Sequence, residues 1–354
     1  MENRRIFVTG ATGMVGYHVV KHFLSKGDRI TACVRTSSNT TQLKKLSGDL
    51  TIITTELRDR AALSRAMTSH DVVIHCAGSV NPHARREDIF ETNVSGTKAA
   101  LDAASNGGVK QFIHVSSLSV ITGQEDQFAV DESAPLRYCG EAYADSKVDA
   151  EKAVTDYPQR GSMSWTIVRP GFIYGPQERA WMPRLINNLK TKKAMLIDGG
   201  GKETNVIYVE NLCRAIDLAL LNAHAYGQVY NLTDGQTPTK KELFDTICDG
   251  MGFARIQKQI PGAIAKTVCE LVSTIAPWLP EEKRQGLSRF SRAAFRLAGV
   301  NQGFSIAKAE QELGYTNRIP FTEGMLETLQ HFKTDDDENQ TPVAVAGADK
   351  VNSR

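Results

Sequence analysis

The sequence predicts an α/β protein in which a doubly wound parallel sheet is followed by a smaller C-terminal α/β lobe. Short runs rich in β-branched residues alternate with helix-like segments through the first half of the 354-residue chain. The alternation loosens after Gly175-Pro176, where the second part of the chain begins. A chain of this length, 41% hydrophobic, can bury one large core or two cores that share a cleft.

The first half supplies the strands and the crossover helices of the sheet. Strands are predicted at residues 5–8, 29–34, 50–54, 71–75, 111–115 and 165–168, and helices at 17–25, 61–69, 89–104 and 141–157. Because parallel neighbours are joined by right-handed crossovers, these helices are expected to cover both faces of the sheet.

The second half carries weaker signals. We expect a helix and a glycine-rich turn within 178–201, strands near 206–209 and 228–232 that complete the sheet, and a helix in 238–251 with Thr239 as its N-cap. Residues 334–354 are polar and lack apolar periodicity, which predicts a disordered tail. The expected division is 1–175 for the sheet domain and 176–333 mainly for a second lobe.

Charge and cysteine usage narrow the function classes. The chain has 42 Lys and Arg against 40 Asp and Glu, a net charge of +2, so no nucleic-acid partner is expected. Its six cysteines are scattered, with no CxxC pair and no histidine at ligand spacing. They are typical of thiols in a reducing compartment, and no metal is expected.

The sequence carries no pattern that predicts export or membrane insertion. No apolar region follows the basic residues near Met1, so no signal peptide is expected. The longest apolar stretch, about 260–279, is interrupted by charges and prolines and is too broken to span a bilayer. A cytoplasmic protein is therefore expected, and a helix that rests weakly on a membrane surface stays an alternative.

A glycine motif lies between the first strand and the first helix. In Val8-Thr-Gly-Ala-Thr-Gly-Met-Val-Gly16 the three glycines allow a tight turn, close approach of a pyrophosphate and close packing of helix on strand. Free N–H groups at the helix start would then face the phosphates. This placement predicts a Rossmann-type dinucleotide site, with contacts from Gly10, Thr12, Gly13, Met14, Val15 and Gly16.

The GxxGxxG spacing resembles the extended short-chain dehydrogenase/reductases of the NAD-dependent epimerase/dehydratase superfamily. Five further motifs follow in that family's order: DVVIHCAG at 71–78, NVSGT at 93–97, VSS at 115–117, YADSK at 143–147 and RPGFIYGP at 169–176. The likeness covers 8–176 and continues more weakly to about 333. It implies further cofactor contacts at Ala77, Gly78, Tyr143, Lys147, Pro170, Phe172 and Ile173.

The end of the second strand bears on the choice of cofactor. An acid that binds the ribose 2′-OH in NAD enzymes is expected at Val34, and Arg35 beside it suits a 2′-phosphate. NADP is therefore favoured. NAD stays an alternative if Arg35 only stacks on the adenine. In this family the adenine edge meets the positions of Glu56 and Leu57.

The YxxxK pair predicts the catalytic chemistry. Tyr143 and Lys147 lie one turn apart on a predicted helix, so the ammonium group can stabilise the tyrosinate and lower the phenol pKa. Ser117 can hold the substrate oxygen while a hydride passes to or from the nicotinamide. The resemblance favours Ser117 over Ser116. Asn93 either supports a proton relay or holds the backbone near Lys147.

Three positions predict an apolar substrate. Sugar-nucleotide epimerases carry Asn where this chain has Phe172 and often Lys where it has Val80, and 4,6-dehydratases carry an Asp-Glu pair where it has Leu118-Ser119. With Trp181, Val80 and Phe172 are the expected substrate contacts. The remaining resemblance is to the 3β-hydroxysteroid dehydrogenase and dihydroflavonol reductase-like branch.

We therefore expect an NADP-dependent oxidoreductase that interconverts a ketone and a secondary alcohol on a steroid-, flavonoid- or β-keto-acid-like substrate. A sugar-nucleotide epimerase and a non-catalytic, cofactor-sensing binding protein stay as alternatives. Within 261–300, an apolar stripe either roofs the substrate or packs as core: Ile264, Val268, Leu271, Val272, Ile275, Trp278 and Leu279. The resemblance also implies a homodimer through the helices at 89–104 and 141–157.

Overall fold

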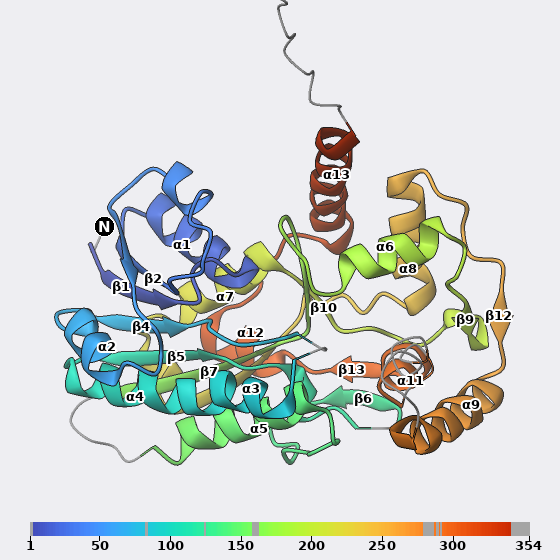
Figure 1. Ribbon diagram of the computed structural model, residues 1–354, viewed down its shortest axis with the longest axis horizontal. Helices are drawn as coiled ribbons and strands as arrows, with labels where there is room; N and C mark the ends of the chain where they lie inside the picture. The colour runs from blue at the N-terminus through green and yellow to red at the C-terminus, as the bar shows by residue number, and fades with distance from the viewer. Residues whose placement is uncertain are drawn as a thin grey trace, which may run out of the picture.

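A computed structural model describes residues 3–340 except 82–83, 124, 158–162, 279–286, 288–289 and 291. Its centre is a seven-stranded sheet in the order β11-β7-β5-β4-β1-β2-β3, in which every neighbouring pair is parallel (Figure 1). Its strands are β1 (Arg5–Thr9), β2 (Arg29–Val34), β3 (Leu50–Thr54), β4 (Val72–His75), β5 (Gln111–Val115), β7 (Ser164–Pro170) and β11 (Gln228–Leu232). The predicted fold class is confirmed.

Helices cover both faces of this sheet, as the crossover argument requires. One face packs against α1 (Met14–Ser25), α7 (Val209–Ala219) and α12 (Ala307–Leu313). The other packs against α2 (Arg60–Met67), α4 (Gly96–Asn106) and α5 (Ala142–Thr155). Within β1, Ile6 and Val8 belong to the first core and Phe7 to the second, so both faces of the strand are buried.

One predicted strand lies outside the main sheet. The segment near 206–209 forms β10 (Val206–Tyr208), which pairs with β8 (Phe172–Tyr174) in a separate two-stranded sheet, so only β11 completes the main sheet. The chain leaves β7 at Gly171, whose N–H donates to the Leu232 carbonyl. A Cβ on Gly171 would lie 2.2 Å from the Asn205 carbonyl oxygen, so glycine permits this close crossing of two backbones.

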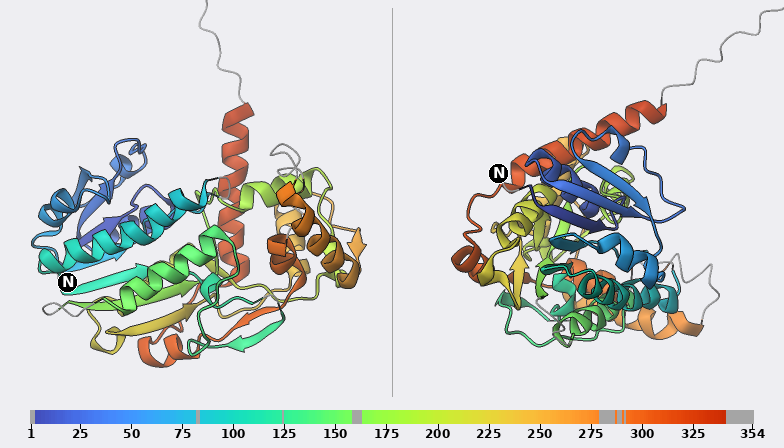
Figure 2. Two further views of the ribbon diagram at one scale, coloured as in Figure 1. Left: turned by 60° about the horizontal axis from the view of Figure 1, so that its bottom comes forward. Right: turned by 90° about the vertical axis from the view of Figure 1, so that its left-hand side faces the viewer.

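The rest of the chain forms the lobe at one end of the molecule (Figures 1 and 2). Its elements are β6 (Gln127–Val130), β9 (Leu196–Ile197), β12 (Gln259–Ile260), β13 (Gln302–Phe304), α6 (Met182–Lys190), α8 (Lys240–Met251), α9 (Gly262–Ile275), α11 (Arg292–Gly299) and α13 (Phe321–Gln340). A short helix α3 (Arg86–Phe90) and a π turn η2 (Glu91–Ser95) precede α4. The N-cap of α8 is Thr239, which forms a capping box with Glu242.

The last helix differs from the prediction for the tail. α13 continues to Gln340, so the first part of the segment expected to be disordered is helical. Residues 341–354 lie outside the described residues. The segment up to Gln340 is helical because the Met325 and Leu329 side chains anchor the start of α13 in the core of the lobe, and the helix continues from there. In Figure 1 its far end projects from the body of the molecule.

Candidate active site

The glycine loop has the geometry that a dinucleotide requires. Gly10 has a φ of 67°, and a Cβ there would lie 2.7 Å from the backbone of Ala77. A Cβ on Gly16 would lie 2.2 Å from the Gly10 carbonyl oxygen. Gly13 is the N-cap of α1, and no side chain caps this helix. The first N–H groups of α1 therefore stay open toward a phosphate, and the loop fits the pyrophosphate of a dinucleotide.

A buried histidine connects this loop to β4. His75 Nδ1 lies 2.8 Å from the Thr9 hydroxyl, and Nε2 lies 3.1 Å from that of Thr97. The Thr9 hydroxyl also accepts from the N–H of Ala77 at 3.3 Å. Burial lowers the pKa of His75 to about 3, so the ring is neutral. His75 is thus a core histidine beside the cofactor loop.

The predicted catalytic side chains meet at the carboxyl end of β5. Ser117 follows this strand directly and lies beside Tyr143 on α5, close enough for its hydroxyl to act on the pKa of the phenol. Lys147 lies one turn further along α5, and its ammonium group donates to the Val115 carbonyl oxygen at 2.8 Å. The end of β5 and the start of α5, which are separate in the sequence, therefore meet at one edge of the sheet. Ligands of open α/β sheets bind at this edge.

The two neighbouring serines have different environments. Ser116 is buried, and its hydroxyl donates to a Glu151 carboxylate oxygen at 2.8 Å. The same carboxylate pairs with the buried guanidinium of Arg169, whose Nε donates at 3.0 Å. Ser116 is therefore tied into a buried ionic network, whereas Ser117 is half-buried beside Tyr143. This difference supports the choice of Ser117 over Ser116.

Asn93 ties the loop after β4 to the helix that carries Tyr143 and Lys147. Its side-chain oxygen Oδ1 accepts from the N–H of Ser79 at 2.6 Å, and its side-chain nitrogen Nδ2 donates to the Ser146 hydroxyl at 2.8 Å. Ser146 in turn donates to the carbonyl oxygen of Tyr143 at 2.7 Å. Of the two roles left open for Asn93, these contacts support that of holding the backbone near Lys147. Ser79 and Ser146 were not identified from the sequence, since no local pattern marks them.

Burial dominates the electrostatics of the catalytic pair. It raises the pKa of Tyr143, and the hydrogen bond with Ser117 opposes that rise. Burial also lowers the pKa of Lys147 to about 8. The sequence argument expected Lys147 to lower the Tyr143 pKa. The direction differs because loss of water around the phenol outweighs the hydrogen bond, while the lysine ammonium is held at Val115.

The ends of β2 and β3 meet the glycine loop. Arg35 is exposed, and its backbone N–H donates to Ser38 Oγ at 3.2 Å. Ser38 Oγ also lies 3.4 Å from the Thr12 hydroxyl. The Glu56 carboxylate accepts from the N–H of Thr36 at 3.4 Å. The region that would hold the adenosine ribose thus contains both a cation and a carboxylate, and the carboxylate comes from the loop that follows β3.

The remaining predicted cofactor residues surround the same edge of the sheet. A Cβ on Gly78 would lie 3.5 Å from the Lys147 ammonium, so this loop passes close to the Lys147 side chain. Leu57 packs against Gly96 at the start of α4. Pro170 ends β7, and Phe172 and Ile173 lie in β8, the strand that leads into the second lobe.

Two of the three predicted substrate residues lie together. The rings of Phe172 and Trp181 are edge-on, with centroids 6.2 Å apart, and Trp181 Nε1 donates to the Ile173 carbonyl oxygen at 2.8 Å. Val80 is exposed on the loop after β4. The sequence argument missed Glu178, whose carboxylate accepts from the N–H groups of Trp181 and its neighbours. An acid just before a helix start is the signal that could have identified it.

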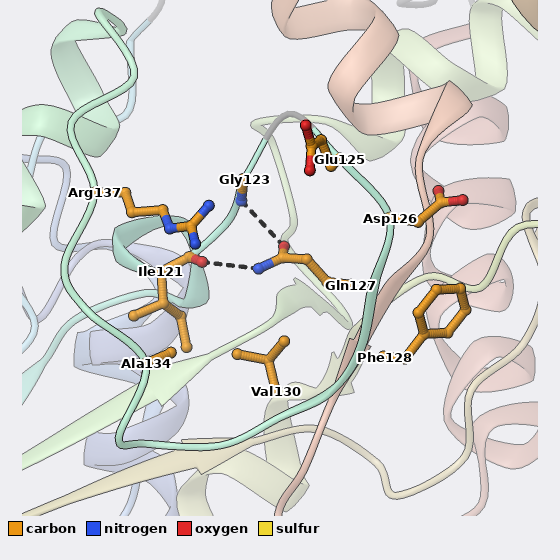
Figure 3. A pocket seen from close by; sticks show the side chains of 9 residues that line it. All are labelled: Ile121, Gly123, Glu125, Asp126, Gln127, Phe128, Val130, Ala134 and Arg137. Atoms are coloured by element: carbon orange, nitrogen blue, oxygen red, sulfur yellow. Dashed lines mark hydrogen bonds between the residues drawn. The ribbon is translucent and has the colours of Figure 1, made fainter.

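A surface pocket of about 280 Å³ lies in the segment between Ser117 and Tyr143 (Figure 3). Its lining is Ile121, Gly123, Glu125, Asp126, Gln127, Phe128, Val130, Ala134 and Arg137. Gln127 closes it on one side, because its amide donates to the Ile121 carbonyl oxygen and accepts from the N–H of Gly123. No predicted catalytic or substrate residue is in this lining, so the pocket is separate from the catalytic side chains.

Two features are absent from the residues that the structure describes. In that part of the chain no group of three or more His, Cys, Asp and Glu side chains is arranged to hold a metal ion. Within the same residues, no helix combines the length and the apolar character that crossing a bilayer requires.

Comparison with known proteins agrees with this geometry. The model of the NAD dependent epimerase/dehydratase family matches residues 6–233. A farnesyl-dihydroquinoline-oxide ketoreductase from Stigmatella aurantiaca is 29% identical, over 91% of this chain and 94% of that protein. A decarboxylating sterol-4-alpha-carboxylate 3-dehydrogenase from Schizosaccharomyces pombe is 29% identical, over 95% and 99%. A 2-alkyl-3-oxoalkanoate reductase from Shewanella oneidensis is 25% identical, over 90% and 84%.

Solved structures share the fold. A dTDP-glucose 4,6-dehydratase from Streptomyces venezuelae, solved with NAD bound, superposes with a TM-score of 0.75 at 22% identity, covering 94% of this chain and 98% of that one. The glycine loop, the Ser117–Tyr143–Lys147 set and the family match over 6–233 lead to one conclusion. The chain belongs to the NAD dependent epimerase/dehydratase family, the extended short-chain dehydrogenase/reductases.

Proposed function

We propose that this protein is an NADP-dependent oxidoreductase that interconverts a ketone and a secondary alcohol on a hydrophobic substrate. The observation that carries the proposal is the position of Ser117 beside Tyr143, with Lys147 one turn along α5 at the same sheet edge. The Ser117 and Tyr143 hydroxyls can hold one substrate oxygen atom between them, and the buried Lys147 ammonium lies close by. Such a set is suited to proton transfer at a carbonyl or hydroxyl group.

Each side chain has a distinct task in the reduction direction. A bound nicotinamide cofactor would supply the hydride to the carbonyl carbon. Ser117 and Tyr143 hold the carbonyl oxygen, and the Tyr143 hydroxyl gives it a proton as negative charge develops there. The Lys147 ammonium, together with the backbone that Asn93 holds in place, stabilises the tyrosinate that remains. Alcohol oxidation runs through the same groups in reverse.

The surroundings of this pair support an apolar substrate. Phe172 stands where a diphosphate-binding amide is expected in a sugar-nucleotide enzyme, and its ring packs on Trp181. Three relatives are named for a farnesyl-bearing oxo compound, a sterol carboxylate and a 2-alkyl-3-oxoalkanoate, and the farnesyl, sterol and alkyl groups are apolar. A steroid-, flavonoid- or β-keto-acid-like ketone is the class that fits these observations.

The preference for NADP rests on Arg35. Its exposed guanidinium, at the end of β2 beside the Ser38–Thr12 contact, can meet a 2′-phosphate. Glu56 at the neighbouring strand end favours a ribose hydroxyl and opposes this preference, so NAD is the competing cofactor.

We also propose a homodimer through α4 and α5, which lie side by side on the outside of the molecule (Figure 1).

The variant Tyr143→Phe tests the reaction. It is expected to abolish reduction of apolar ketones while NADPH still binds, measured by turnover and by a fluorescence titration of the same preparation. Retained turnover would refute the mechanism. Turnover of a sugar nucleotide with no net change of cofactor would identify an epimerase. Cofactor binding with no turnover of either class by the unmodified protein would favour a binding protein.

A further inference from the structure

Helix α9 and the short turn η6 (Ala276–Trp278) expose a stripe of large apolar side chains. Ile264 is 53% exposed, Leu271 59%, Ile275 46% and Trp278 86%. Their spacings of seven, four and three residues place them on one side of the helix. Of the apolar residues predicted to form a stripe here, Val268 and Val272 are half-buried, whereas Ile264, Leu271, Ile275 and Trp278 face solvent and do not pack as core. Leu279 lies outside the described residues.

The opposite flank of α9 shows that the exposure is not a consequence of a loosely attached helix. Ala265 and Cys269 are buried, and α11 packs along α9. Because these buried positions are offset from the stripe, the helix is anchored on one side and free on another. A contiguous row of large apolar side chains held in this way is typical of a docking surface.

Charge indicates the kind of surface that this helix meets. Between residues 258 and 292 the sequence has six Lys and Arg against three Asp and Glu, whereas the whole chain has a net charge of only +2. Among the described residues of this segment, three cations (Lys258, Lys266 and Arg292) and one acid (Glu270) are exposed. An amphipathic helix with a tryptophan at one end in a basic segment fits an anionic bilayer surface.

The position of α9 in the molecule allows a flat surface to approach. α9 lies at the end of the long axis that is remote from β1, β2 and β3, on the lobe that follows the catalytic domain (Figures 1 and 2). We propose that this protein docks on anionic phospholipid membranes through the stripe Ile264, Leu271, Ile275 and Trp278, without crossing the bilayer. A stripe of four side chains suits one interfacial helix better than the roughly 20–30 residues per side of a standard protein interface.

This inference goes beyond the proposed function and does not depend on it, because its test measures binding only. The purified full chain is mixed with vesicles of equal parts phosphatidylcholine and phosphatidylglycerol and centrifuged. Binding is expected, and it is expected to weaken as salt is added and to fall on vesicles of phosphatidylcholine alone. The double variant Leu271→Ser/Trp278→Ser is expected to reduce the vesicle partition coefficient at least about tenfold.

A matched control separates the stripe from apolar exposure in general. Leu326 on α13 has an exposed fraction of 57%, similar to the 59% of Leu271, and Leu218 on α7 is also exposed. The variant Leu218→Ser/Leu326→Ser is expected to bind vesicles as the unmodified chain does. Absence of vesicle binding by the unmodified chain, or equal losses in both variants, would overturn the proposal. So would a change from dimer to monomer in Leu271→Ser/Trp278→Ser with unchanged vesicle binding, which would assign the stripe to a second copy of the chain.

Discussion

The two adjacent serines give the sharpest test of the site. Ser116→Ala and Ser117→Ala remove the same hydroxyl group one residue apart, yet the structure assigns the two groups to different tasks. Ser116 donates to the buried Glu151 carboxylate at 2.8 Å. Ser117 is half-buried and lies beside Tyr143. The first substitution is expected to act on stability and the second on turnover.

The expected magnitudes follow from these contacts. A hydrogen bond to a charged group contributes about 1.5–3 kcal/mol, so Ser116→Ala is expected to lower the free energy of unfolding by about that amount. Its catalytic rate should stay within about twofold of the unmodified enzyme, because no reacting atom loses a partner. Loss of a donor that stabilises a developing oxyanion typically costs about 10²–10³ in kcat, which is the expectation for Ser117→Ala.

Both quantities are measurable on the same preparations. Urea denaturation gives the free energy of unfolding, and NADPH consumption with an apolar ketone gives kcat and KM. Equal losses of turnover in Ser116→Ala and Ser117→Ala, with both proteins as stable as the unmodified chain, would contradict these separate roles. That outcome would mean that the hydroxyl groups share one role and that the Glu151 contact has no structural importance.

Three further predictions concern the cofactor and the catalytic lysine. Gly10→Ala is expected to weaken NADPH binding at least about tenfold, because the added Cβ would lie 2.7 Å from backbone atoms. In the same titration Gly13→Ala is expected to lose less affinity for NADPH, because its Cβ would lie 3.3 Å from the nearest atom. Burial lowers the pKa of Lys147 to about 8, so the lysine loses its charge as the pH rises through that value. We therefore expect kcat/KM for reduction to fall above about pH 8, and Lys147→Arg, if active, to move that fall to higher pH. Arg35→Ser is expected to weaken NADPH binding at least about tenfold and to leave NADH binding nearly unchanged, and equal losses for both would show that Arg35 does not select the cofactor.

Much of the catalytic domain follows from the sequence by itself. The alternation of apolar runs and amphipathic segments specifies β1 to β5 within one residue at each end. The signal is clearest for β4 and β5, because strands buried on both faces are continuously apolar or nearly so. The glycine loop is recognisable because only glycine tolerates the contacts at Gly10 and Gly16. Tyr143 and Lys147 are recognisable because one turn of helix places them together. Each of these signals is local.

Other features were decided only by the tertiary structure. The pairing of β10 with β8 depends on the meeting of Gly171 and Asn205 across the fold. The different roles of Ser116 and Ser117 depend on Glu151, which arrives from α5. Whether an apolar stripe on α9 is covered or exposed depends on what packs against it. The sequence by itself determines local periodicity and turn chemistry, whereas partners distant in the chain are set by packing, which no single segment encodes.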